Sequence, residues 1–388
     1  MNTTLSPILV QRFCALQTEL IPEVVTEMDG LTTKLEQIIR VLEWSRIENL
    51  LQTWVSAGPG QPQIDRCALV SAFVAKAVLD LKTTRALIER LQVDKRLKRI
   101  CGFDMHRALP SEATFSRAFD EFATSELATR AHQKMIESQL GDSLIGHISR
   151  DSTAIEAREK VAGKPAKPEA PEPILGQAPE SIPDVVPAPV VKAKPGRPRK
   201  GEQRPPAPVS PLERQSGQDL AQMLAELPLA CSVGTKRNAS GYKISWKGYK
   251  LHLDTACCGV IISAVLTGAV VHDSRVALPL SIISAQRVDY LYELMDAAYC
   301  STIIRDFVMG QGRVPLIDHN PRAGEKIEFA PAQAQRYNTR TGAKRANARL
   351  KDEFGARHVY VRGNSKIMSH LMFGVVALCA DQLIRLLQ

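Results

Sequence analysis

Apolar residues recur at helical spacing near the start of the chain. A spacing of i, i+3, i+4 and i+7 predicts one buried helix face, and it is formed by Leu35, Ile38, Ile39 and Leu42. The pattern repeats twelve residues later, from Ile47 to Trp54. Twelve residues turn a helix face by about 120°, so this stretch is either one broadly buried helix or two shorter ones. We treat residues 1–60 as a helical N-terminal segment.

Further helical patterns follow up to about residue 140. One covers 67–81, the next covers 85–91 behind the capping Thr83, and another opens at Pro110-Ser111. The last carries a stripe of Phe115, Phe119 and Phe122, which we interpret as core and not as a platform for stacking bases. Three short helices between 67 and 122 allow a helix-turn-helix, so residues 61–140 are a candidate DNA-binding domain.

Beyond residue 140 the pattern changes to strands, which predicts an α/β fold of the α+β type with a mixed sheet. We expect strands at 144–155, 231–234, 242–255, 260–271, 289–296 and 314–318, with a helix at 275–283. Two helices, a basic one at 337–351 and an apolar one at 366–387, close the chain. A short amphipathic helix is expected at 212–227. Asp151 lies within the first of these strands, and Asp296 ends the strand at 289–296.

Residues 157–211 interrupt this domain just after the first strand. The segment holds more than half of the chain's 24 prolines and no aromatic residue, a composition typical of disordered or polyproline-type segments. It contains Gly196-Arg197-Pro198 between further cations, which resembles an AT-hook, whose arginine lies in an A·T minor groove. The alternative is a basic patch that only keeps a linker soluble. Arg197 is therefore a candidate DNA contact.

Composition adds charge to this picture. The 388-residue chain is 44% hydrophobic and has a net charge of +9, with a pI of about 9.1, which suits a polyanionic partner. No apolar run approaches about 18 residues and the N-terminus shows no secretory signal, so we expect no membrane span. The eight cysteines lack metal-ligand spacing and are interpreted as reduced thiols of a cytoplasmic protein. The adjacent Cys257 and Cys258 are expected to pack beside a turn.

The basic helix at 337–351 carries the clearest candidate chemistry. If it is one helix, four side chains fall within roughly 60° of one another: Tyr337, Arg340, Lys344 and Lys351. Three cations and a phenol on one face can hold phosphates. A solvated basic helix would show the same pattern.

Several motifs together carry a family resemblance. They are Arg150-Asp151-Ser152-Thr153, the run 248–254, His272-Asp273-Ser274, the run 295–299 and the basic helix with Leu350–Gly355 at its end. From about residue 65 onward the chain is similar to bacterial insertion-sequence DDE transposases. It resembles the branch whose third acid lies in a Tyr-x2-Arg-x3-Glu-x6-Lys signature. The resemblance, like the order of the elements, implies an RNase H-like domain at 141–388.

The resemblance also implies a function and its residues. Asp151 and Asp296 would be catalytic ligands of Mg²⁺ or Mn²⁺, two ions about 4 Å apart in a complete site. Tyr337, Arg340 and Lys351 would hold DNA phosphates around the cleaved bond. The partners would be double-stranded DNA, both element ends and target, with the protein a homo-oligomer on DNA. It would reside in the bacterial cytoplasm, associated with the nucleoid when bound.

The chain departs from the signature at one position, where Lys344 replaces the glutamate. Asp352 and Glu353 cannot replace it on a regular helix, because rotation and rise carry them away from that position. An ammonium group there would oppose binding of the second metal ion. The expectation is a transposase whose strand cleavage is impaired; the alternatives are an intact enzyme with unusual ligands, a nuclease that never joins strands, and a non-catalytic DNA-binding relative.

Other polar residues near these motifs receive weaker expectations. His272 and Asp273 either lie near the site or cap the following helix. Asp318, at the end of the last strand, is expected to support a loop or lie behind the site. His252 is interpreted as a satisfied core residue.

Overall fold

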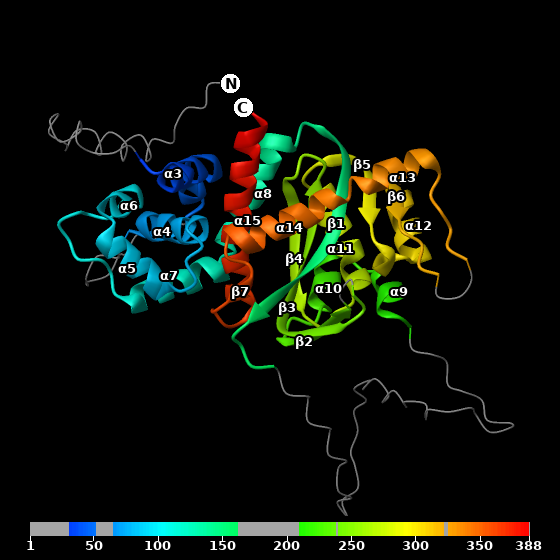
Figure 1. Cartoon of the computed structure of the whole chain (residues 1–388), viewed down its shortest axis with the longest axis horizontal. Helices are drawn as coiled ribbons and strands as arrows, with labels where there is room; N and C mark the ends of the chain where they lie inside the picture. The colour runs from blue at the N-terminus through cyan, green and yellow to red at the C-terminus, as the bar shows by residue number, and fades with distance from the viewer. Residues whose placement is uncertain (1–30, 52–64, 162–208, 238–239, 322–324, 388) are drawn as a thin grey trace, which may run out of the picture.

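The computed structural model describes residues 31–51, 65–161, 209–237, 240–321 and 325–387. Within these residues a helical region and a mixed α/β region lie side by side (Figure 1). Arg197, its AT-hook-like neighbours and most of the Pro-rich segment fall outside the described residues, as does Trp54.

Helices from the first part of the chain pack around a common core. They are α3 (Thr33–Ser45), the 3-10 helix η1 (Ile47–Leu50), α4 (Arg66–Val78), α5 (Thr84–Val93), α6 (Lys95–Ile100), α7 (Glu112–Thr124) and α8 (Leu127–Leu140). Arg46, in the left-handed conformation, separates α3 from η1, so the alternative of two shorter helices is confirmed. The phenylalanine stripe of α7 is buried, with Phe73 packed against all three of its rings, which confirms its core role.

The α/β region is built on a seven-stranded mixed sheet. Its strands are β1 (Leu144–Ala157), β2 (Ser232–Arg237), β3 (Lys243–Ala256), β4 (Ile261–Gly268), β5 (Asp289–Met295), β6 (Val314–Ile317) and β7 (His358–Val359). β1 lies in the middle, antiparallel to β3 and parallel to β5. β4 is antiparallel to β3, β6 is parallel to β5, and β7 pairs with the end of β1. The expected mixed sheet is therefore confirmed.

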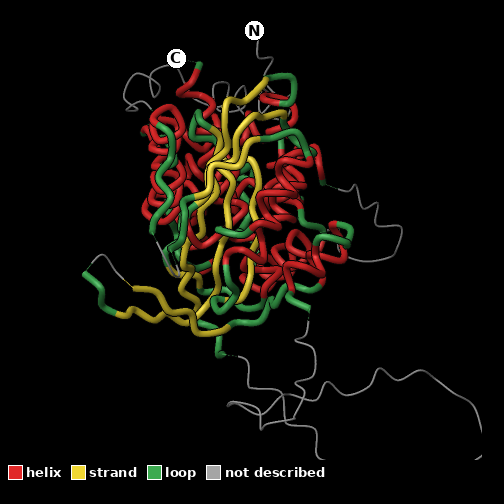
Figure 2. Tube along the Cα trace, turned by 90° about the vertical axis from the view of Figure 1, so that its right-hand side faces the viewer, coloured by secondary structure: helices red, strands yellow, loops and turns green. Residues whose placement is uncertain are grey.

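Helices cover both faces of this sheet, which Figure 2 shows nearly edge-on. They are α9 (Pro211–Gln215), α10 (Leu220–Ala225), the 3-10 helix η2 (Asp273–Val276), α11 (Ala277–Ala285), the 3-10 helix η3 (Ala297–Tyr299), α12 (Thr302–Gly310), α13 (Pro331–Asn338), α14 (Thr341–Glu353) and α15 (Asn364–Leu386). The expected helix at 212–227 is in fact two short ones. The expected basic helix at 337–351 is also wrong as one helix, because α13 ends at Asn338 and α14 begins at Thr341.

The C-terminal helix α15 joins the two regions. It packs against α3, α4, α7 and α8 of the helical region and against β4 and α14 of the other. By length and composition it could cross a membrane, yet 78% of its apolar window is buried inside the protein. Its apolar character therefore reflects a core position between the two regions.

Candidate active site

Asp151 and Asp296 lie close together, although 144 residues of sequence lie between them. Asp151 is in the middle of β1, and Asp296 directly follows the neighbouring strand β5. One guanidinium nitrogen, Nη1 of Arg340, lies 3.6 Å from Oδ1 of Asp151 and 3.9 Å from Oδ2 of Asp296. The two carboxylate oxygens are therefore no farther apart than the sum of these distances, well inside the limit of about 10 Å beyond which they could not share a two-metal centre.

The break between α13 and α14 places Arg340 at this point. Thr339 and Arg340 both keep right-handed dihedrals, with Arg340 as the first residue before α14. The Thr339 hydroxyl is bonded to the carbonyl of Arg336 and lies 3.1 Å from Nε2 of His147 on β1. Because α13 is held to the central strand at this turn, the Arg340 side chain reaches back to both aspartates.

Asn347 on α14 is a site residue that the sequence reasoning missed. Its Nδ2 donates a hydrogen bond of 3.0 Å to Oδ2 of Asp151, and its own Oδ1 is buried without a hydrogen-bond partner among the described residues. Asn347 lies seven residues after Arg340, two helical turns away and on the same face. The sequence shows this spacing, but a pattern of cations does not include a neutral amide side chain.

The electrostatics of the pair are dominated by burial. Desolvation raises the pKa of both aspartates above the usual value, while the charge of Arg340 acts in the opposite direction. Asp296 raises the pKa of Asp151 further. Raised carboxyl pKa values from burial and a like-charged neighbour are typical of functional sites, although structural networks can produce them too.

Lys344 lies on the exposed side of α14, at the position where the sequence resemblance places the third acid. Its charge favours ionisation of both aspartates, which places its ammonium group within electrostatic range of the pair. The neighbouring acids are engaged elsewhere, Glu353 with Arg349 and Asp352 with Arg357. That neither acid replaces the glutamate of the family signature stays a prediction.

The donor set does not fit a divalent-metal centre. Within the described ranges no group of three or more His, Cys, Asp or Glu side chains could hold a metal ion. Two carboxylates converge, but Arg340 provides the cation between them and no third carboxylate of the described residues joins them.

The other expected DNA contacts lie at the two ends of this helix pair. The Tyr337 ring on α13 packs 4.9 Å from the Phe329 ring and 5.7 Å from the Arg340 guanidinium. Lys351 lies near the end of α14, where burial lowers its pKa and the charges of Lys236 and Arg357 lower it further. Tyr337 and Arg340 are thus close together, but the break after Asn338 means that the four expected residues do not share one helix.

A fully buried ionic network lies behind the pair, on the opposite face of the sheet. Neighbouring residues of a strand point to opposite faces, so Arg150 faces α11 while Asp151 faces α14. Arg150 donates two 2.7 Å hydrogen bonds to Asp254 on β3, lies 3.2 Å from Glu293 on β5, and donates to the carbonyl of Ala277. Through these contacts it ties together the three strands that position the two aspartates.

The weaker candidates mostly have local structural roles. His272 caps η2 by accepting from the Ser274 amide, and Asp273 forms a 2.8 Å ion pair with Lys250 and accepts from Ser152. Asp318 pairs with Lys326 at 3.2 Å. His252 is fully buried and bonded to Thr267, which confirms it as a core residue.

Tyr299 is a buried group near the site that the sequence reasoning did not use. Its side chain is fully buried, and its hydroxyl has no hydrogen-bond partner in the described part of the chain. Burial raises its pKa far above the usual value, and the charges of Asp273, Asp296 and Asp151 contribute. The phenol therefore stays protonated beside the carboxylates.

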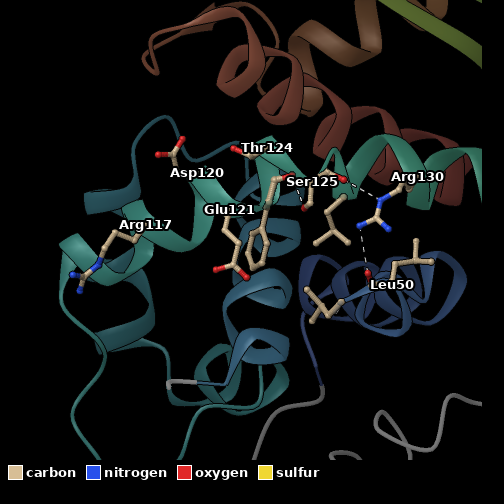
Figure 3. Close-up of a pocket in the computed structure, with 10 residues that line it drawn as sticks. Leu50, Arg117, Asp120, Glu121, Thr124, Ser125 and Arg130 are labelled. Atoms are coloured by element: carbon tan, nitrogen blue, oxygen red, sulfur yellow. Dashed lines mark hydrogen bonds between the residues drawn. The ribbon is translucent and has the colours of Figure 1, made fainter. Parts of the chain in front are cut away.

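A concave pocket of about 400 Å³ lies elsewhere, between η1 and helices α7 and α8 (Figure 3). Arg130 spans it by donating to the carbonyls of Ser125 and Leu50, and Glu121 contributes a carboxylate to its lining. Neither Asp151 nor Asp296 lines it. The pocket is a feature of the helical region and not of the carboxylate pair.

The fold is that of an α/β protein whose mixed sheet brings two aspartates together. Comparison with known families agrees with this class. Residues 229–380 match the family described as Transposase DDE domain, and residues 24–121 match the family described as Transposase domain (DUF772). No curated protein and no solved structure matches the chain.

These two matches support an insertion-sequence DDE transposase, a family that depends on divalent metal and implies DNA as a partner. The first match begins at residue 24, so the resemblance extends farther toward the N-terminus than the sequence motifs indicated. The second begins after the Pro-rich segment and omits Asp151. The pairing of β1 with β3 and β5 nevertheless brings Asp151 into the same sheet.

Proposed function

We propose that this chain is a transposase that binds the DNA ends of its element and that its strand-cleavage step is impaired. The observation that carries the proposal is the position of Lys344, whose charge reaches the Asp151–Asp296 pair. A carboxylate at that position would add an oxygen ligand, whereas an ammonium group repels a second cation. Cleavage and strand transfer belong to the ancestral activity, with Mg²⁺ or Mn²⁺ as its metal.

The proposal includes an RNase H-like fold, recognition of the element ends and oligomerisation on DNA. The strand order β4-β3-β1-β5-β6, with an aspartate in the first strand and another after β5, is the arrangement expected of an RNase H-like domain. Tyr337, Arg340 and Lys351 keep the spacing of the Tyr-Arg-Glu-Lys branch. The short helices at 61–140 would recognise the element ends, and the protein would act as a homo-oligomer on DNA in the bacterial cytoplasm.

Lys344 also favours a second function, that of a DNA-binding protein without catalytic activity. A non-catalytic relative would occupy transposon ends through its basic surfaces and perform no chemistry. Lys344 supports this alternative, because its charge acts on both aspartates and would oppose a second metal ion. Such a protein would compete with active copies for the same DNA.

A cleavage assay with variants of residue 344 separates these functions. The substrate is a duplex that carries the DNA flanking the chain's own gene, with Mg²⁺ or Mn²⁺ present. We expect no cutting by the chain as written, and cutting by Lys344→Glu. Lys344→Gln controls for loss of charge without gain of a ligand, and Lys344→Glu combined with Asp296→Asn should again be inactive.

The outcomes have different meanings. Cutting by the unaltered chain would refute the impairment and favour an intact enzyme with unusual ligands. DNA binding without cutting in any variant would favour the non-catalytic alternative. Joining of a 3′-OH end into a target plasmid by the glutamate variant would distinguish a transposase from a nuclease of the same fold.

A further inference from the structure

Part of the sheet extends beyond its body as a two-stranded ribbon. The pairing of β1 with β3 ends at Gly248, and the pairing of β4 with β3 ends at Tyr249. The preceding residues of β3, from Lys243 to Lys247, pair only with β2. We call β2 together with residues 243–247 the ribbon; Figure 2 shows it leaving the body of the molecule. An isolated two-stranded sheet is only marginally stable in water, so a bound partner would stabilise it.

The ribbon is strongly basic and has no acidic residue between 232 and 247. Its exposed cations are Lys236, Arg237, Lys243 and Lys247. Apolar side chains are exposed beside them, with Val233 at 51% and Ile244 at 44%. Cations next to small apolar groups match a DNA groove, where phosphates lie at the rim and thymine methyl groups line the floor.

Local packing holds the base of the ribbon in a defined position. Gly234 lies opposite Trp246, and the indole ring occupies the space that a side chain at 234 would need. The indole nitrogen donates a 3.0 Å hydrogen bond to the carbonyl of Tyr249. At Gly248, with φ 149°, the backbone approaches the carbonyl of Ile155 on β1 so closely that a Cβ would clash. The ribbon therefore projects from a fixed point on the central strands.

The ribbon is also close to the helix that carries the candidate DNA contacts. The charge of Lys236 acts on Lys351 near the end of α14, as does that of Arg357. From Lys351 the same helix leads back to Lys344 and to Arg340 beside the aspartates. Positive charge thus continues from the ribbon along α14 to the carboxylate pair, a path suited to a phosphate backbone.

We propose that the ribbon is a DNA-binding arm that enters the major groove of a duplex whose backbone follows α14. A two-stranded ribbon has the width that the major groove, about 12 Å across, admits. The ribbon lies within the Transposase DDE domain match, which begins at residue 229, but none of the sequence motifs includes it. The inference rests on the proposed function, because it requires that the chain binds double-stranded DNA.

The test measures how binding depends on salt. A fluorescent 30-base-pair duplex is titrated with the full chain at several salt concentrations. The ribbon variant replaces Lys236, Arg237, Lys243 and Lys247 with glutamine. A matched control replaces four exposed cations on other elements, Arg40, Lys134, Arg214 and Arg385. Circular dichroism and thermal melting establish that both variants are folded.

Each lost phosphate contact lowers the slope of log K against log salt by about 0.9. We expect the ribbon variant to lose about 2 to 4 units of slope and at least tenfold in affinity near 0.15 M salt, with the control changing by less than about 1 unit. Equal slopes for the ribbon variant and the unaltered chain would overturn the inference and leave the proposed function standing. No binding by the unaltered chain would overturn the proposed function itself. A change in self-association without a change in slope would make the ribbon a protein interface and overturn the inference as well.

Discussion

Replacing the buried Arg150 should lower the free energy of unfolding more than breaking any exposed ion pair. We consider the substitution Arg150→Met, which keeps a long side chain but removes the charge. Arg150, Asp254 and Glu293 all have fully buried side chains. Met in place of Arg150 leaves two carboxylates in the interior, where hydroxyl groups of Ser281, Ser284 and Tyr290 are the remaining donors.

The size of the effect follows from these contacts. Removing one partner of a buried ion pair costs about 3–5 kcal/mol, since the remaining charge cannot be solvated. At about 2–4 °C per kcal/mol for a domain of this size, the melting temperature should fall by about 6–20 °C. The substitution should also loosen β1, β3 and β5, the strands that position Asp151 and Asp296.

The assay is urea unfolding followed by circular dichroism, with thermal melting alongside. Arg85→Met is the matched control, because Arg85 forms an exposed ion pair with Glu112 that should contribute less than about 1 kcal/mol. Adding Asp254→Asn to Arg150→Met should recover part of the lost stability, since one of the two unpaired buried carboxylates is then removed. A loss below about 1 kcal/mol for Arg150→Met, or strict additivity in the double variant, would refute the reasoning.

Two further predictions concern pH. Folding raises the pKa of Asp296 above 3.8, mainly through burial, so ionisation of this carboxyl group destabilises the folded state once the pH exceeds its folded pKa. Asp296→Asn should therefore raise the melting temperature at pH 7 and have no such effect near pH 3. Equal shifts of the melting temperature at both pH values would contradict this. Burial lowers the pKa of Lys76 from 10.5 to about 8, so the folded chain loses this proton at a lower pH than the unfolded chain, and stability should rise between pH 8 and 10.5. Lys76→Met should remove this rise from melting temperatures measured across that range. An unchanged rise would assign it to another group.

The sheet was predictable because its strands carry strong local signals. β1, β3, β4, β5 and β6 lie where alternating or continuous apolar runs placed them. The convergence of Asp151 and Asp296 followed from the resemblance, since 144 residues lie between them and no local rule joins them; their catalytic role stays a prediction. The domain boundaries at 60 and 140 also stay predictions.

The site's helix was not predictable in detail because tertiary contacts interrupt it. The turn residues Thr339 and Arg340 are common within helices, and the hydrogen bond to His147 comes from a distant strand. Asn347 was missed because an amide gives no charge pattern, although it makes the direct hydrogen bond to Asp151. The ribbon was missed for a different reason. Alternation predicted β2 and β3 as strands, but not that β1 and β4 stop pairing before the ribbon begins.

The position of α15 has a consequence for anyone who divides this protein. In the sequence, α15 follows the DDE region, and most of it lies within that family match. In space it fills the centre of the helical region, where Gln37 on α3 donates to Asp381 on α15. A fragment that begins at residue 141 would therefore expose an apolar helix long enough to enter a lipid bilayer or to drive aggregation. The helical region made alone would lack its central helix, so both regions depend on α15.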